Sequence, residues 1–295
     1  MRQELSVLLP SYNDECVELV SQLATECASI NGLQFEIIVG DDGSTDTNVV
    51  STNKQINNIP NCRFILNNKN IGRAAIRNRL AQQSKYNWLL FIDSDMSVIS
   101  HDFIHKYLCA EGQVVYGGYK VIGDSKDYAG NLRFLYEKKA EPALTYEQRC
   151  QHPFADFHTS NFLIAKSIFS SMPLDCRFTQ YGYEDVLYGR TLKENGIMIN
   201  HIDNPLGFSR FEDNFHFVRK SEEGLRTLHT FRKELEGYSR LLSIVEKTNQ
   251  YHLSPLIRFV YNRQKKNWYN NLCSTKPSLF LFKLYKLGYY LSLIP

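Results

Sequence analysis

Short apolar runs alternate with longer amphipathic stretches in the first part of the chain. Each run is rich in β-branched and aromatic residues and has the length of a buried strand. Each stretch between two runs is long enough for a helix that crosses from one strand to the next. The pattern predicts strands at Leu5–Leu9, Phe35–Val39, Arg63–Leu66 and Trp88–Ile92, and helices at Glu15–Ile30, Thr45–Gln55 and Arg73–Ser84.

This alternation predicts an α/β fold that is Rossmann-like, with a mostly parallel central sheet flanked by helices. Ligands of such sheets bind beyond the carboxyl ends of the strands. Polar clusters follow the first, second and fourth predicted strands, and they should therefore meet at one edge of the sheet. These clusters are Pro10-Ser11-Tyr12-Asn13, Asp41-Asp42-Gly43-Ser44-Thr45-Asp46 and Asp93-Ser94-Asp95.

The pattern becomes less regular after residue 113. It predicts a strand at Val114–Tyr116, a turn at Gly117-Gly118 and a helix at Asp185–Asn195. Further on, apolar residues three or four apart predict one amphipathic helix over residues 213–246 that packs on the body. We therefore expect two domains, a catalytic α/β domain at residues 1–210 and a C-terminal helical, basic and aromatic extension at residues 211–295.

The cysteines and the N-terminus indicate a cellular location. The seven cysteines are widely spaced, with no C-x-x-C pair and no histidine at zinc-binding distance, which favours a reducing compartment. The N-terminus lacks the features of a secretory signal, and no apolar run is long enough to span a bilayer. We expect a cytoplasmic protein.

Charge is distributed unevenly along the chain. Residues 251–295 hold seven basic side chains and no acidic one, and because the whole chain is +3, residues 1–250 are near −4. This argues against a nucleic-acid-binding body. Aromatic residues alternate with the cations in this tail, which suits peripheral contact with an anionic membrane at its inner face. The alternative is a helical hairpin that closes over the catalytic domain with its lysines extended into water.

The sequence Asp93-Ser94-Asp95 presents two carboxylates directly after an apolar strand. A hard divalent cation that bridges Asp93 and Asp95 to a diphosphate would compensate their charge. The alternative is a turn that caps the next helix.

The acidic loop after the second strand also has two interpretations. As a ligand loop, Asp41 would accept a hydrogen bond from a nucleobase, with Asp42 beside it, and the following helix N-terminus would favour an anion. As a turn, the loop would only cap that helix through Ser44 or Thr45.

Two further segments carry candidate chemistry. Gly72 begins a helix with small residues, and Arg77 follows about one turn later, either as a donor to a ribose or phosphate or as a solvated charge. Glu184 and Asp185 begin another helix. Asp185 is a candidate general base for an acceptor hydroxyl and Glu184 a hydrogen-bonding partner of the acceptor, although acids in a first turn also offset the helix dipole.

Taken together and in this order, these motifs resemble family 2 glycosyltransferases of the GT-A fold over roughly residues 1–210. The resemblance implies that Asp95, with Asp93, reaches Mn²⁺ or Mg²⁺. It also implies a nucleotide-sugar pocket, whose residues are Pro10, Tyr12, Asp41, Asp42, Asn70, Gly72, Arg77, Asp93 and Ser94.

Members of that family often carry a histidine near the position of Asn204-Pro205 that approaches the metal or the phosphates. In this sequence Phe208 stands at the aligned position, which leaves a third protein contact to the metal unassigned. His201 and His216 lie near this gap, and we interpret each as a packing or surface residue.

The resemblance implies an inverting transferase that moves a hexose or an N-acetylhexosamine from a UDP-sugar to a glycan or lipid-linked acceptor in cell-surface polysaccharide or glycolipid synthesis. A nucleotidyltransferase is disfavoured because its Gly-rich, Arg-containing N-terminal loop is missing. The remaining alternative is a protein of the same fold that binds a nucleotide sugar or a partner without turnover, an interpretation that draws on Phe208.

Overall fold

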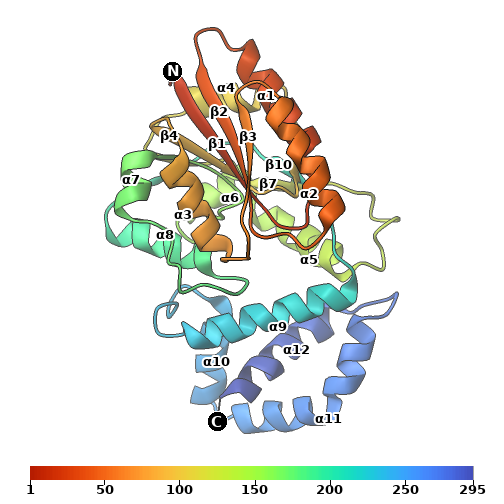
Figure 1. The fold of residues 1–295 in the computed structure, drawn as a ribbon. Coiled ribbons are helices and arrows are strands. Elements are labelled where there is room, and N and C mark those ends of the chain that lie inside the picture. Colours follow the sequence, from red (N-terminus) through yellow and green to blue (C-terminus); the bar gives the residue numbers. More distant parts are fainter. Residues whose placement is uncertain (295) are drawn as a thin grey trace. The chain divides into compact units, whose positions relative to one another are not determined.

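The computed structural model describes residues 1–294 and divides into two compact units (Figure 1). The first unit comprises Met1–Ile122, Ala143–Thr179 and Tyr188–Arg210, and the second comprises Gly123–Pro142, Gln180–Leu187 and residues 211–294. The predicted catalytic domain 1–210 and extension 211–295 stay a prediction of functional organisation.

A seven-stranded sheet forms the centre of the first unit, and its α/β class confirms the prediction from the sequence. The strand order is β3-β2-β1-β4-β8-β6-β9, and among the described strands of this sheet only β8 runs antiparallel to its neighbours. The strands are β1 (Glu4–Ser11), β2 (Gln34–Asp41), β3 (Cys62–Leu66), β4 (Trp88–Ile92), β6 (Val114–Tyr116), β8 (Asn161–Ala165) and β9 (Ile199–His201).

Helices cover both faces of this sheet, with α1 and α3 on different sides of it (Figure 1). They are α1 (Val17–Ser29), α2 (Thr47–Asn53), the 3₁₀ helix Lys54–Asn58, α3 (Arg73–Gln83), α4 (Phe103–Cys109), α6 (Tyr146–Gln151) and α7 (Lys166–Ser171), while α8 (Glu184–Glu194) begins in the second unit.

The core on the α3 side is built from alternate strand residues, as the two-residue period of a strand requires. Leu8, Ile38 and Phe91 point to this face and pack with Leu80 of α3. The ring of Phe91 stacks on that of Phe162 with centroids 4.8 Å apart. This packing fixes which residues of each strand face the core on the α3 side.

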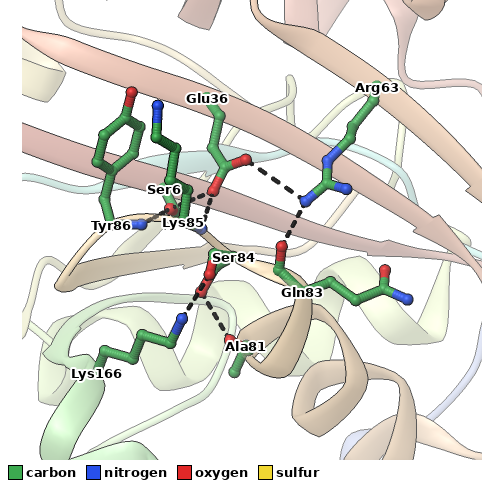
Figure 2. Close-up of polar contacts among 9 residues, drawn as sticks. All are labelled: Ser6, Glu36, Arg63, Ala81, Gln83, Ser84, Lys85, Tyr86 and Lys166. Carbon is green, nitrogen blue, oxygen red and sulfur yellow. Dashed lines mark hydrogen bonds and ion pairs between the residues drawn. The ribbon is translucent and has the colours of Figure 1, made fainter.

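A polar network joins β1, β2 and β3 to the segment between α3 and β4 (Figure 2). Glu36 accepts a hydrogen bond from Ser6 Oγ at 2.7 Å and another from the Lys85 amide. Arg63 Nη2 lies 3.5 Å from the Glu36 carboxylate and donates to the Gln83 carbonyl at 2.5 Å. These bonds anchor the chain well away from the carboxyl ends of the strands.

A small second sheet in the same unit has the strand order β5-β10-β7. Its strands are β5 (Met96–Ser97), β10 (Leu206–Phe208) and β7 (Tyr119–Val121). Phe208 pairs with Met96 across the antiparallel β5/β10 ladder. The segment directly after Asp95 is therefore held by backbone hydrogen bonds.

The second unit is helical. Its elements are α5 (Leu132–Ala140), the 3₁₀ helix Glu141–Ala143 at its border, α9 (Asn214–Thr230), α10 (Arg240–Gln250), α11 (Ser254–Leu272) and α12 (Leu279–Leu293). Phe217, Tyr261, Phe282 and Tyr285 share its aromatic core. A Cβ on Gly288 would come within 2.5 Å of the Tyr261 ring, so α11 and α12 approach closely only because this residue is glycine.

The prediction of one helix over residues 213–246 was wrong. The chain forms α9 and α10 instead, with turns between Phe231 and Ser239. Helix α9 ends at Thr230, Gly237 has a φ of +77° in the turns that follow, and Ser239 then caps α10 through its hydroxyl. The predicted helix at Asp185–Asn195 is confirmed as α8.

No helix among residues 1–294 has the combined length and apolarity that crossing a membrane demands.

Candidate functional site

The polar clusters after the first and second strands meet where the sequence predicted, at the carboxyl edge of the main sheet. In the β1/β2 ladder Pro10 pairs with Gly40 and Ser11 with Asp41. Strand β4 is the other neighbour of β1, and Asp93 follows it with its amide donating to the Ser160 carbonyl at 3.0 Å. Parallel pairing therefore places the predicted residues along one edge.

The loop after β2 is closed by its own polar side chains. Asp41 is fully buried, and its two carboxylate oxygens accept from the Ser44 amide at 2.7 Å and the Ser44 hydroxyl at 2.6 Å. Asn13, after β1, accepts from the amides of Thr45 and Asp46 at 2.8 and 2.9 Å. Both carboxylate oxygens of Asp41 are therefore hydrogen-bonded within the loop.

The cap of helix α2 differs from the prediction. Asp46, rather than Ser44 or Thr45, accepts from the first amides of the helix, at 2.9 Å from Asn48 and 3.4 Å from Val49. Ser44 is engaged with Asp41 instead. The Ser44 hydroxyl donates to the buried Asp41 carboxylate because leaving that carboxylate without a donor would cost more free energy than leaving the helix end uncapped by Ser44.

Asp42 holds the neighbouring loop. Its carboxylate is buried and accepts from the amides of Ile71 and Gly72 at 2.8 and 3.0 Å. Gly43 has a φ of +75°, and a Cβ there would lie 2.4 Å from the Lys69 carbonyl carbon. The acidic loop and the loop around Asn70 thus pack backbone to backbone, and Asp42 positions Asn70 and Gly72.

Arg77 is buried rather than solvated, with 1% of its surface exposed. Its guanidinium forms an ion pair with the Asp93 carboxylate, and Nη1 donates to the Arg73 carbonyl at 3.1 Å. Arg73 also reaches Asp93, at 3.5 Å, from the same helix face four residues earlier. Arg73 was not predicted from the sequence, although it stands four residues before Arg77 and directly after Gly72.

The remaining predicted residues of this edge differ in exposure. Ser94 is buried, and Tyr12, directly after β1, is 47% exposed. Asn70 accepts from the Gly72 amide at 3.1 Å and is exposed. Gly72 has a φ of +94° and begins α3.

Phe208 lies in β10 opposite Met96, close in the ladder to Asp95, and it is 5% exposed. Its ring meets that of Tyr119 edge to face at 6.4 Å. A phenyl ring has no lone pair to offer a cation. Within residues 1–294 no group of three or more His, Cys, Asp or Glu side chains is arranged to hold a metal.

A second set of buried polar residues holds the predicted Gly117-Gly118 turn beside Asp93, and of these residues Arg149 was not predicted from the sequence. The Gly117 amide donates to the Asn161 carbonyl at 3.2 Å, and Asn161 Nδ2 donates to the Gly118 carbonyl at 2.7 Å. Arg149 is 3% exposed and donates to the carbonyls of Tyr116 and Gly117 at 3.3 and 3.1 Å. The signal in the sequence was two adjacent glycines, which allow the Arg149 guanidinium to approach the backbone at Gly118.

His201 forms a hydrogen bond with the same arginine, Arg149. Arg149 Nη1 lies 3.1 Å from His201 Nδ1, and His201 Nε2 lies 2.9 Å from the Pro153 carbonyl. A donor on one nitrogen and an acceptor on the other select the neutral Nε2–H tautomer. Burial first, and then the Arg149 charge, lower the pKa of His201 from its ordinary 6.5 to about 4, despite the opposing bond to Pro153.

Glu184 and Asp185 belong to the second unit and begin α8. Asp185 Oδ1 accepts from the Val186 amide at 2.8 Å. The preceding loop is bound to α9, since the Tyr181 amide donates to Glu223 at 2.9 Å and Gly182 lies against Gly224. Tyr183 has a φ of +69°, a strained conformation for a bulky residue. The catalytic role of these two acids stays a prediction.

Comparison with known proteins identifies relatives of the chain. A sequence model of the family described as "Glycosyl transferase family 2" matches residues 6–172. The chain is 24% identical over 239 residues to a chondroitin synthase of Escherichia coli, a match that covers 69% of this chain and 34% of that protein. It is 31% identical over 104 residues to an uncharacterized glycosyltransferase of Haemophilus influenzae, covering 35% and 40%. The chain thus spans about a third to two fifths of these relatives.

Solved structures share the fold. The mannosyltransferase PcManGT of Pyrobaculum calidifontis, in complex with GDP-Man and Mn²⁺, superposes with a TM-score of 0.56 at 12% identity and covers 99% of this chain and 86% of its own. Residues 1–349 of S. aureus TarS, in complex with UDP-GlcNAc, superpose with a TM-score of 0.53 at 16% identity and cover 100% and 82%. These likenesses support the GT-A fold.

Removing the buried cation should destabilise the first unit. We expect Arg77→Leu to lower the free energy of unfolding by about 3 kcal/mol or more, because Asp93 loses its buried partner. Arg73→Leu, at a side chain that is 41% exposed, should cost ~1 kcal/mol or less. Urea unfolding of both variants measures the difference. Equal losses would contradict the dominance of Arg77.

His201 should make the protein less stable in acid. Its folded pKa of about 4 lies below the ordinary 6.5, so the unfolded chain takes up a proton first and stability falls as the pH drops from about 6.5 to about 4. His201→Gln should flatten that part of the stability curve, as measured by urea midpoints at several pH values. The exposed His101→Gln is the control, and an unchanged slope in His201→Gln would refute the assignment.

Proposed function

The chain belongs to glycosyl transferase family 2, and from that premise we propose that it moves a hexose or N-acetylhexosamine from a UDP-sugar to an acceptor hydroxyl with inversion of the anomeric centre. The observation that carries the proposal is the convergence at one sheet edge of the acidic loop after β2, the exposed Tyr12 and the Asp93 carboxylate held by Arg77. This arrangement suits a nucleoside diphosphate at the carboxyl ends of the strands.

The nucleotide would use donors and acceptors that the loops already hold in place. We assign Asp41 as the acceptor for the base, and the exposed Tyr12 follows the neighbouring strand β1. Asn70 and Gly72 form the loop on the other side of the acidic segment, positioned by Asp42. Pro10, Ser94 and Arg77 complete the proposed pocket, with Arg77 acting through Asp93.

The residues after β4 fit a divalent cation that is bound mainly through the substrate. Asp93 and Asp95 offer hard oxygen ligands, and Mg²⁺ or Mn²⁺ commonly combines one or two carboxylates with phosphate oxygens. We assign Asp95 as the direct ligand, because Asp93 is shared with two arginines. When bound, the cation would offset the negative charge that develops on the departing diphosphate.

Uridine is the proposed base because of the resemblance to family 2 enzymes. The neighbouring structures show that the fold accommodates different nucleotides, since TarS holds UDP-GlcNAc and the mannosyltransferase holds GDP-Man with Mn²⁺. The donor is therefore decided by side chains in the pocket. The Gly117-Gly118 turn and Asn161 lie next to Asp93 and are candidates for contact with the sugar.

Asp185 is the proposed general base and Glu184 the proposed partner of the acceptor. A single displacement that is assisted by a base inverts the anomeric centre. The acceptor proposed is a glycan or a lipid-linked glycan in cell-surface polysaccharide or glycolipid synthesis, on the cytoplasmic side of the membrane. The match to a chondroitin synthase supports a polysaccharide product.

The competing function is nucleotide-sugar binding without turnover, and Phe208 is the observation that favours it. The two proposals differ in whether bound donor is consumed: the first experiment below measures donor binding and the second measures turnover.

Donor binding should be specific and should need a metal. We expect one UDP-sugar to raise the melting temperature in the presence of Mn²⁺ and to do so much less in its absence or in Asp95→Asn, because a ligand of the folded state stabilises it. GDP-sugars should give smaller shifts. No shift with any nucleotide would contradict the proposed pocket, and a shift with a GDP-sugar alone would correct the base.

Asp185→Asn should abolish transfer and leave donor binding intact. A base contributes roughly 10²–10⁴-fold to the rate, so turnover should fall by that factor while the donor-induced shift in melting temperature stays unchanged. The control is Glu194→Gln, at the other end of the same helix, and this variant should transfer sugar at the wild-type rate. If Asp185→Asn also loses donor binding, the assignment as a base fails.

A further inference from the structure

Helix α11 carries a row of exposed apolar side chains. Leu256 is 60% exposed, Phe259 61% and Val260 39%. Their spacing of three and four residues places them on one face of the helix. Large apolar groups gathered on one exposed face commonly mark an interaction site. We name Leu256, Phe259 and Val260 the apolar row.

The core of the second unit explains why this face stays exposed. Tyr261 and Leu272 are the large apolar residues of α11 that are buried, and they join the core with Phe282 and Tyr285. The Tyr261 ring lies against Gly288 of α12, which holds that side of α11 inward. Tyr261 is two residues from Phe259, so the apolar row points away from the core.

The charged side chains of α11 itself all have one sign. Helix α11 contains Arg258, Arg263, Lys265 and Lys266 and no acidic residue. The Arg263 guanidinium lies over the Phe259 ring, 5.6 Å from its centroid. A surface that combines apolar side chains with cations alone complements a partner that is both apolar and anionic. A second copy of α11 would instead bring cations against cations.

A groove lies beside the apolar row. Its volume is about 710 Å³, and Arg258 lines it at the start of α11. Arg258 Nε is buried and has no hydrogen-bond partner among the described residues. The side chain as a whole is partly exposed, and its guanidinium can donate to an anionic acceptor in the groove. The other lining residues are Asn249, His252, Ser254, Pro255, Phe259, Asn262 and Ile294.

We infer that α11 is a docking surface for an anionic lipid bilayer, with the apolar row entering the interface and the groove at Arg258 receiving a lipid phosphate. This inference goes beyond sugar transfer and does not depend on it, because no residue of the surface belongs to the proposed donor pocket. It assigns to specific side chains the membrane contact that the composition of the tail indicated.

The test is cosedimentation of the full-length protein, without nucleotide, with vesicles of phosphatidylcholine alone or mixed with phosphatidylglycerol. We expect binding only to the anionic vesicles. Leu256→Ser with Phe259→Ser should weaken binding about tenfold or more through lost apolar contact. Arg258→Gln and Arg263→Gln should each weaken it about fivefold.

Two matched variants in the first unit serve as controls. Met198→Ser removes an apolar side chain that is 64% exposed, and Lys54→Gln removes an exposed cation, and neither should change vesicle binding. Circular dichroism and urea midpoints verify that every variant folds. Transfer of sugar to a water-soluble acceptor should be unaffected by the α11 variants, which separates failure of this inference from failure of the proposed function.

Three results would overturn the inference. The first is equal binding of the wild type to both kinds of vesicle or to neither. The second is unchanged binding of the doubly substituted apolar row. The third is sedimentation velocity showing a dimer that Leu256→Ser with Phe259→Ser dissociates, because the apolar row would then be an interface between copies.

Discussion

The site depends on how negative charge is accommodated at the end of a desolvated sheet. Asp41, Asp42 and Asp93 follow buried strands, where water cannot solvate all of their oxygens. Each carboxylate therefore requires donors, and each finds them in a different place: the Ser44 hydroxyl and amide, the amides of the loop after β3, and two arginines of α3. Satisfying these charges is what brings three loops together.

This requirement also separates residues that position from residues available to a ligand. Asp42 and Arg77 are occupied by internal contacts and hold Gly72 and Asp93 in place. Tyr12 and Asn70 are exposed beside them. A buried frame with exposed groups attached to it is a general way to keep a binding site preorganised. The Gly117-Gly118 turn is held in the same manner by Arg149 and Asn161.

The second unit is organised around an apolar core. Its core is made mostly of aromatic rings, which bury large areas but leave a long helix such as α11 covered on one side only. The close contact between Tyr261 and Gly288 sets which side is covered. The cations that made the tail conspicuous in the sequence consequently lie beside exposed apolar groups, as at Arg263 and Phe259.

Periodicity along the chain was sufficient for the class of fold and for the edge at which the site lies, because both follow from local alternation and from the geometry of parallel strands. It was insufficient for the break between α9 and α10, where apolar spacing continued across Gly237. Periodicity also did not predict the partners of Arg77, Arg73 and Arg149. The sequence position of an arginine does not show whether its guanidinium will bind a carboxylate or a backbone carbonyl in the folded protein.

By itself, then, the sequence determined the order of the strands along the chain, the acids that follow them and the excess of cations in the tail. Only the tertiary structure decided which acid pairs with which arginine, that Asp42 holds a loop and that one face of α11 stays open. The physical reason is that hydrogen bonds, ion pairs and burial depend on groups far apart in the chain, whose proximity exists only once the sheet and the helices have packed.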